Sequence, residues 1–138
     1  MAGSATDIWE KKILDHIFRN ASLGLDATNV WVGLFTGAPS DSAAGTEVSA
    51  GSYARVAVIR TGAGWDAAAG DSPSLTDNTG AVTFTTATAN WGTVTHFGIF
   101  DAATTGTLLY WGDLTTTKVV NNGDTASFAA GTIDITQD

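Results

Sequence analysis

Two histidines, His16 and His96, are the side chains best suited to proton transfer near neutral pH, and they lie far apart in the sequence. A serine nucleophile needs such a histidine beside it, and the G-x-S-x-G turn that presents one does not occur. The chain has no cysteine, so it lacks a Cys nucleophile, a thiolate zinc site and disulfides. Two distant histidines supply too few nitrogen ligands for zinc. We therefore predict no catalytic residues and no His-based or Cys-based metal site.

The carboxylates are mostly aspartates in predicted turns, where the side chain accepts hydrogen bonds from nearby backbone N–H groups. No Asp-x-Asp-x-Asp-Gly calcium loop occurs, so a weak calcium site from grouped loop carboxylates stays only as an alternative. A carboxylate pair for glycoside hydrolysis depends on distance in space, so the sequence leaves it open. Gly62-Ala63-Gly64 lacks the third glycine and the following helix of a phosphate-binding loop. We predict no cofactor.

The composition indicates one β-rich domain of 138 residues, with 14% charged residues and 16 glycines. The net charge is −8, yet residues 7–19 hold three acids and three bases. The rest of the chain has 11 acids against Arg55, Arg60 and Lys118, which argues against a direct nucleic-acid partner. No apolar leader and no stretch of membrane-spanning length is present. We expect a mature chain that begins at Met1, is soluble and has no membrane partner.

One helix is predicted from Asp7 to about Asn20, with Asp7 and Glu10 resembling a capping box. At helical spacing, one stripe is apolar and the opposite side is charged. Ile8 and Trp9 fall off that stripe. They either pack on loops of the same chain or, with Lys12 and His16 nearby, dock on an acidic neighbouring subunit. The apolar stripe consists of Ile13, Leu14, Ile17, Phe18 and Ala21.

The remaining pattern predicts short strands separated by turns, which is typical of an antiparallel, jelly-roll-like β-sandwich of seven or eight strands. The strongest signal is a hairpin from Trp91 to Leu114, which turns at Ala102 to Gly106 with glycine in the left-handed conformation. Further strands are expected at 30–36, 53–60, 81–86, 118–120, 126–128 and 132–136. We assign residues 1–24 to an N-terminal arm and amphipathic helix, and residues 25–138 to the β-sandwich of a single globular protein.

Residues 61–80 form the longest stretch without periodicity, and loops of that length are usually functional or mobile. Trp65 lies within this stretch and has no periodic apolar partners. It either tucks under its own loop or meets a partner protein or a sugar.

The chain resembles a family of small structural proteins of tailed bacteriophages. The resemblance is carried mainly by two segments of the hairpin, Trp91-Gly92-Thr93-Val94-Thr95-His96-Phe97-Gly98-Ile99-Phe100-Asp101-Ala102 and Leu108-Leu109-Tyr110-Trp111-Gly112. Tyr53-Ala54-Arg55 and Asn122-Gly123-Asp124-Thr125 extend this resemblance, which runs from about Val30 to Ile135. Members of the family are commonly described as tail fibre or virion structural proteins. The resemblance implies a non-enzymatic virion component.

On this basis the leading expectation is a capsid decoration, or cement, protein on the outer capsid surface. It would bridge major capsid protein subunits as a homotrimer, because symmetric sets close exposed sheet edges. The alternatives are a tail fibre or tail adaptor that contacts the host surface and a carbohydrate-binding module that uses Trp65 for a host glycan. A glycan-cleaving enzyme is the weakest alternative. The candidate protein contacts are Ile8, Trp9, Lys12, His16 and Trp65.

Overall fold

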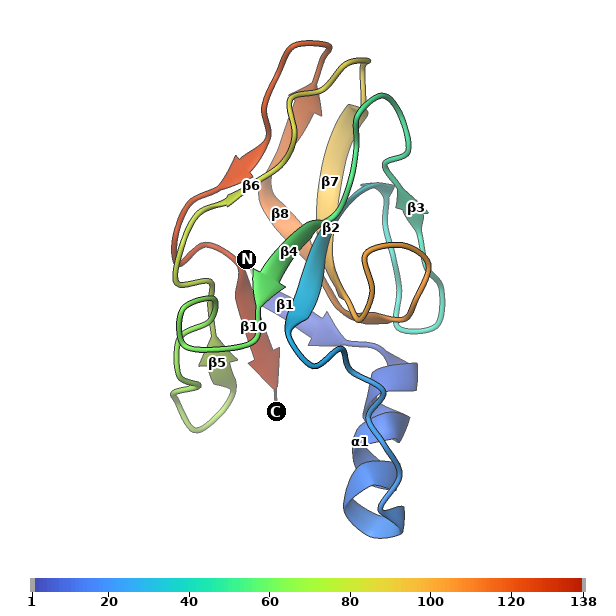
Figure 1. The fold of residues 1–138 in the computed structure, drawn as a ribbon, viewed down its shortest axis with the longest axis vertical. Helices are drawn as coiled ribbons and strands as arrows, with labels where there is room; N and C mark the ends of the chain where they lie inside the picture. The colour runs from blue at the N-terminus through green and yellow to red at the C-terminus, as the bar shows by residue number, and fades with distance from the viewer. Residues whose placement is uncertain (1, 138) are drawn as a thin grey trace.

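The computed structural model describes residues 2–137, which form a mainly β protein with one helix (Figure 1). The predicted class, a β-rich body with an N-terminal helix, is confirmed. The elements are β1 (Ala2–Ala5), α1 (Asp7–Arg19), β2 (Asn29–Gly37), β3 (Thr46–Glu47), β4 (Val56–Ile59), β5 (Ser74–Thr76), β6 (Val82–Thr83), β7 (Gly92–Phe100), β8 (Leu108–Val120), β9 (Ser127–Phe128) and β10 (Asp134–Gln137).

Eight strands form one sheet in the order β3-β2-β7-β8-β1-β10-β5, and β4 pairs with β2 beside β3. The centre of this sheet is β2-β7-β8. The side chains of β2 illustrate how these central strands are buried on both faces. Val32 and Leu34 point to one face and are buried in the main core, while Trp31 and Phe35 point to the other face and join a smaller apolar cluster. Both faces of these strands are covered, which explains their nearly continuous apolar sequence.

The two-stranded sheet β6-β9 covers the main-core face of the large sheet. Phe128 on β9 meets Phe97 on β7 edge to face, with 6.2 Å between ring centroids. Tyr53 and Trp91 make a similar contact at 5.3 Å, and Phe84 packs against both. Such aromatic pairs stabilise a core beyond their buried area. The two layers pack face to face as in a sandwich.

On the opposite face, Phe35 and Phe100 stack with 5.9 Å between their centroids. Glycine is required beside them, because a Cβ on Gly98 would lie 2.6 Å from the ring of Phe35 and 2.6 Å from Leu108. The predicted hairpin turn is also confirmed. Gly106 has φ +71°, and Asp101 Oδ1 accepts a hydrogen bond from the Thr107 N–H at 2.6 Å.

The structure differs from the sequence prediction in strand number and in direction. Among residues 2–137 there are ten strands rather than seven or eight, because β1, β3 and β5 are two to four residues long and too polar or small to show alternation. The sheet is mixed rather than wholly antiparallel, since β1 pairs in parallel with β10. Residues 2–5 thus form a strand between β8 and β10 of the large sheet.

The long 61–80 segment is held against the body instead of hanging free. β5 pairs with β10, and Trp65 bridges to Asn78. Asn78 is fully buried, and its amide donates to Gly80 O and Ala129 O while its oxygen accepts from the N–H groups of Thr132 and Ile133. All four hydrogen bonds lie between 2.8 and 3.0 Å, so one side chain ties this loop to the segment before β10.

Candidate interaction surfaces

The beginning of α1 is anchored in the β body by two side chains. Thr6 caps the helix by accepting from the Trp9 N–H, and its hydroxyl donates to Leu108 O at 2.8 Å. Trp9 is only 7% exposed, and its indole N–H donates to the Tyr110 hydroxyl at 3.0 Å. Trp9 is therefore part of the core and fixes the first turn of the helix to the body.

The rest of α1 leaves the body, as Figure 1 shows at the lower end of the molecule. Lys12 holds its middle through an ion pair of 3.8 Å with Asp101 in the hairpin turn. Beyond that point His16 contacts Ala21 O through Nδ1 at 2.8 Å, and Asn20 ends the helix in the left-handed conformation. These local bonds close the helix end without help from the body.

The projecting half of α1 carries an apolar face that the described chain leaves in solvent. Leu14 is 57% exposed, Ile17 63% and Phe18 79%. Ile13, at the edge of the same stripe and nearer the body, packs against the main core, as do Leu23 and Leu25 of the return segment. Apolar side chains clustered on one exposed face mark an interaction site. We call Leu14, Ile17 and Phe18 the helix face.

The candidate contact residues on this helix thus differ in their surroundings: some are buried or bonded within the chain, and others are exposed. Trp9, a candidate contact, lies in the chain's own core, as the first of its two alternatives has it, while Ile8 beside it is 54% exposed. Lys12 and His16 are engaged within the chain, although His16 is exposed. The helix face was visible in the sequence as an apolar stripe, but the stripe alone could not show that only Ile13 is covered.

Trp65 is partly buried and packs against the main core. Its ring lines an apolar cavity of about 250 Å³ together with Trp9, Val30 and Ile135. The Trp65 indole N–H is buried and has no hydrogen-bond partner among residues 2–137. The structure thus places Trp65 partly within the main core, and a contact of its ring with a partner protein or a sugar stays a prediction.

Arg55 connects several segments on the opposite face of the sheet. In the sequence, this residue stood out only as part of the Tyr53-Ala54-Arg55 segment. Its guanidinium binds both carboxylate oxygens of Glu47 at 2.8 Å and lies 3.3 Å from the centre of the Phe100 ring. It also donates to Ala102 O and Thr105 O in the hairpin turn, at 2.8 and 2.7 Å. The result is a network that joins β3 to the hairpin turn.

Tyr53 completes this network. Its hydroxyl donates to Glu47 Oε1 at 2.8 Å and accepts from the Leu34 N–H at 2.9 Å. Burial, the largest cause, raises the pKa of the Tyr53 hydroxyl, and the Glu47 carboxylate raises it further. The hydroxyl therefore stays protonated and can keep donating.

The second histidine, His96, lies on β7 and contacts two side chains of the sheet. His96 Nε2 lies 2.6 Å from Asp113 Oδ1, and its Nδ1 lies 2.7 Å from the hydroxyl of Thr95, so the ring is held within the sheet. Within residues 2–137, no three His, Cys, Asp or Glu side chains are grouped to hold a metal ion. In the same range no helix is both long and apolar enough to span a membrane.

The described residues form a β-rich body with one projecting helix, and the side-chain networks of Arg55 and Asn78 hold its loops together. Residues 4–136 match the protein family described as podophage GP4 fiber I protein gp80, and the chain belongs to this family. A search of curated proteins found no match.

The family confirms the resemblance to structural proteins of tailed phages and indicates a non-enzymatic structural role in the virion. Between the two virion locations considered from the sequence, it supports the tail-fibre alternative better than the leading capsid-decoration expectation.

Proposed function

We propose that this protein is a fibre component on the tail side of a podophage virion and that it attaches to a neighbouring virion protein through the helix face of α1. The single observation that carries the attachment is the exposure of Leu14, Ile17 and Phe18 on a helix whose base is locked into the body. Burying about three such side chains in a partner contributes several kcal/mol.

Charge supports the choice of an attachment element. The helix residues 7–19 carry three acids and three bases, whereas the rest of the chain is strongly acidic. A neutral helix can approach an acidic or a neutral virion surface without the repulsion that the body would meet. Attachment to the major capsid protein, as a decoration protein, is the competing proposal, and the family match gives it less support.

A double substitution on the helix face tests the attachment. Leu14→Glu together with Phe18→Glu should abolish incorporation into virions, because two charges replace the apolar contact, while the melting temperature should stay near that of the native chain since both side chains are exposed. Ile59→Glu, a single change from an apolar to a charged side chain at a 41% exposed position on β4, is the control and should still be incorporated. Normal incorporation of the double variant would contradict the proposal.

Location is tested separately by electron microscopy of virions that carry the gold-labelled native chain. We expect the label on the tail side of the particle. Label spread over the capsid shell would support the decoration alternative instead, and stabilisation of undecorated shells by added protein would agree with it.

A further inference from the structure

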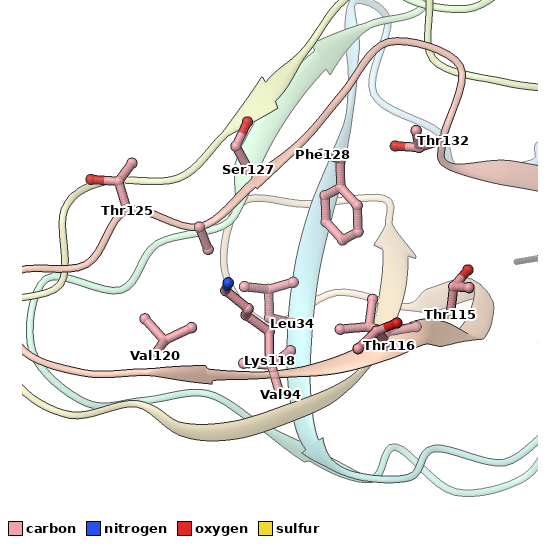
Figure 2. A pocket seen from close by; sticks show the side chains of 12 residues that line it. Leu34, Val94, Thr115, Thr116, Lys118, Val120, Thr125, Ser127, Phe128 and Thr132 are labelled. Atoms are coloured by element: carbon pink, nitrogen blue, oxygen red, sulfur yellow. The ribbon is translucent and has the colours of Figure 1, made fainter.

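The two sheets leave an open groove between β8 and β9. Figure 2 shows Phe128 pointing into it from β9, with Leu34 and Val94 behind and the end of β8 along the other side. The groove has a volume of about 530 Å³, within the range of sites that hold a ligand of substantial size. Its apolar lining is Leu34, Val94, Leu114, Val120, Ala126 and Phe128.

Both strands that border the groove have an unpaired edge. β1 pairs with β8 only at Tyr110 and Trp111, and beyond Trp111 that edge of β8 has no strand partner among residues 2–137. On its other edge, β8 loops out between Asp113 and Lys118 relative to β7. Within the same described range, β9 pairs with β6 alone.

The topology makes this groove the position of a missing strand. On the side away from the groove, the small sheet contacts the large sheet, because β6 lies next to β4, and β4 pairs with β2. The β6-β9 pair and the strands β4-β2-β7-β8 thus curl round one core, with a packing contact rather than a hydrogen-bonded pairing between β6 and β4, and the groove lies between the two end strands, β8 and β9. Closing a sheet on itself is the way in which such folds remove free edges.

We infer that this groove binds an extended segment of another virion protein, which adds a strand between β8 and β9. The inference deepens the proposed function by giving a second contact and its chemistry. Free strand edges recognise an extended backbone, whose N–H and C=O groups complete the ladders while alternate side chains enter the groove. A helix or a sugar cannot present backbone N–H and C=O groups to a strand edge at the spacing of a β-ladder.

The lining also defines the chemistry of the bound segment. Side chains that point inward must be apolar to meet Leu34, Val94 and Val120, and the flanking threonines and Ser127 suit small or hydroxyl-bearing neighbours. Lys118 is the one charged residue in the lining, so a carboxylate on the bound segment fits beside it. The lining lacks the Trp, Asp and Asn side chains on which the glycan alternative depended.

A second copy of the chain is a poorer source of this segment. β1 and β10, the strands nearest the two chain ends, each pair with two neighbours, so a second copy would have to break its own sheet to donate either of them. A segment from a different protein carries no such cost.

The experiment measures fluorescence polarisation of overlapping synthetic peptides, taken from the other virion proteins of the encoding phage, against the purified full chain. We expect a peptide with alternating apolar residues and a carboxylate to bind. Hydrogen exchange should then slow at residues 115–119 and 126–128, where new backbone hydrogen bonds form.

Two variants of the chain test the position of binding. Ala126→Trp fills the groove and should lower the affinity on the order of tenfold or more. Lys118→Glu, at an exposed side chain that leaves the core untouched, should lower it about fivefold, while Lys11→Glu on α1 makes the same charge change and should not.

The inference is overturned if no peptide binds, if Lys118→Glu and Lys11→Glu affect binding equally, or if exchange slows elsewhere. Binding of glycans, but not peptides, that is lost in Ala126→Trp would also overturn it. These measurements use the purified chain and do not involve the helix face, so their failure leaves the proposed attachment through α1 standing, and the reverse also holds.

Discussion

At the scale of single residues, Arg55 joins more parts of the molecule than any side chain that the sequence singled out. It binds Glu47 through two oxygens, stacks on Phe100 and holds two carbonyl groups of the hairpin turn, while its own side chain is 8% exposed. Lysine has the same charge but cannot make the two-pronged contact or stack in this way. The position therefore demands arginine.

Replacing this side chain tests the network. We predict that Arg55→Lys lowers the free energy of unfolding by about 2 kcal/mol, because it loses the planar contact and leaves turn carbonyls without donors. Arg19→Lys is the control, since Arg19 makes only an exposed pair with Asp15. Chemical denaturation measures both, and equal stability of the two variants would show that the network contributes little.

Asp77 is a second residue whose environment has a measurable consequence. Burial, followed by the charge of Asp66, the hydrogen bond with Asp66 and the charge of Asp134, raises the pKa of the Asp77 carboxyl above its ordinary 3.8. Its Oδ1 atom is buried and has no hydrogen-bond partner among residues 2–137. A raised pKa means that the folded protein holds the proton more tightly than the unfolded chain does.

The raised pKa of Asp77 determines whether its contribution to folding stability grows or falls with pH. Asp77 favours folding fully below its unfolded pKa of about 3.8, and that contribution is lost as pH rises through the raised folded pKa. Asp77→Asn should therefore raise the melting temperature at neutral pH and give no gain in acid below the ordinary carboxyl pKa. Thermal melts of both chains across this range provide the measurement, and a gain that is the same at every pH would rule out titration as the cause.

At the scale of elements, the N-terminal segment is divided between core and surface. β1 lies between β8 and β10, and Thr6 and Trp9 are buried, whereas the later turns of α1 project from the body. From the sequence we assigned residues 1–24 to an arm and helix and the β-sandwich to residues 25–138, a division under which the β body would not need residues 1–20. The structure gives a reason to expect otherwise.

We predict that deletion of residues 1–20 lowers the melting temperature sharply or prevents folding, since it opens the large sheet at β8 and β10 and removes a buried tryptophan. Circular dichroism and thermal melts report this directly. The helix-face double variant, which keeps β1 and Trp9, serves as the comparison and should melt like the native chain. A stable truncated body would show that β1 is dispensable.

At the scale of the whole molecule, the free edges of the large sheet are mostly short. β3 and β5, which lie at its two ends, have two and three residues, and short edges resist unwanted pairing. Among residues 2–137, the part of β8 beyond Trp111 is a longer free edge. The sequence-based argument that a homotrimer closes exposed edges therefore bears mainly on this region.

The homotrimer itself stays a prediction. Virion components occur in symmetric sets, so we expect light scattering on the purified chain to give three times the monomer mass. The helix-face double variant then reports whether α1 contributes, since loss of the trimer in that variant would place α1 between copies. A monomer mass at all accessible concentrations would contradict the prediction.

The sequence by itself determined the features that depend on neighbouring residues: the helix at 7–20, the hairpin with its left-handed Gly106, the β-rich class and the resemblance to phage structural proteins. Periodicity, caps and turn residues act locally, so they can be recognised without coordinates. Only the tertiary structure decided that Trp9 is buried while Phe18 is exposed, that β1 joins β10 in parallel and that β8 and β9 leave a groove. The burial of Trp9 and the pairing of β1 depend on contacts with Tyr110 and Asp134, far along the chain, and no local pattern encodes which apolar side chains such contacts will cover.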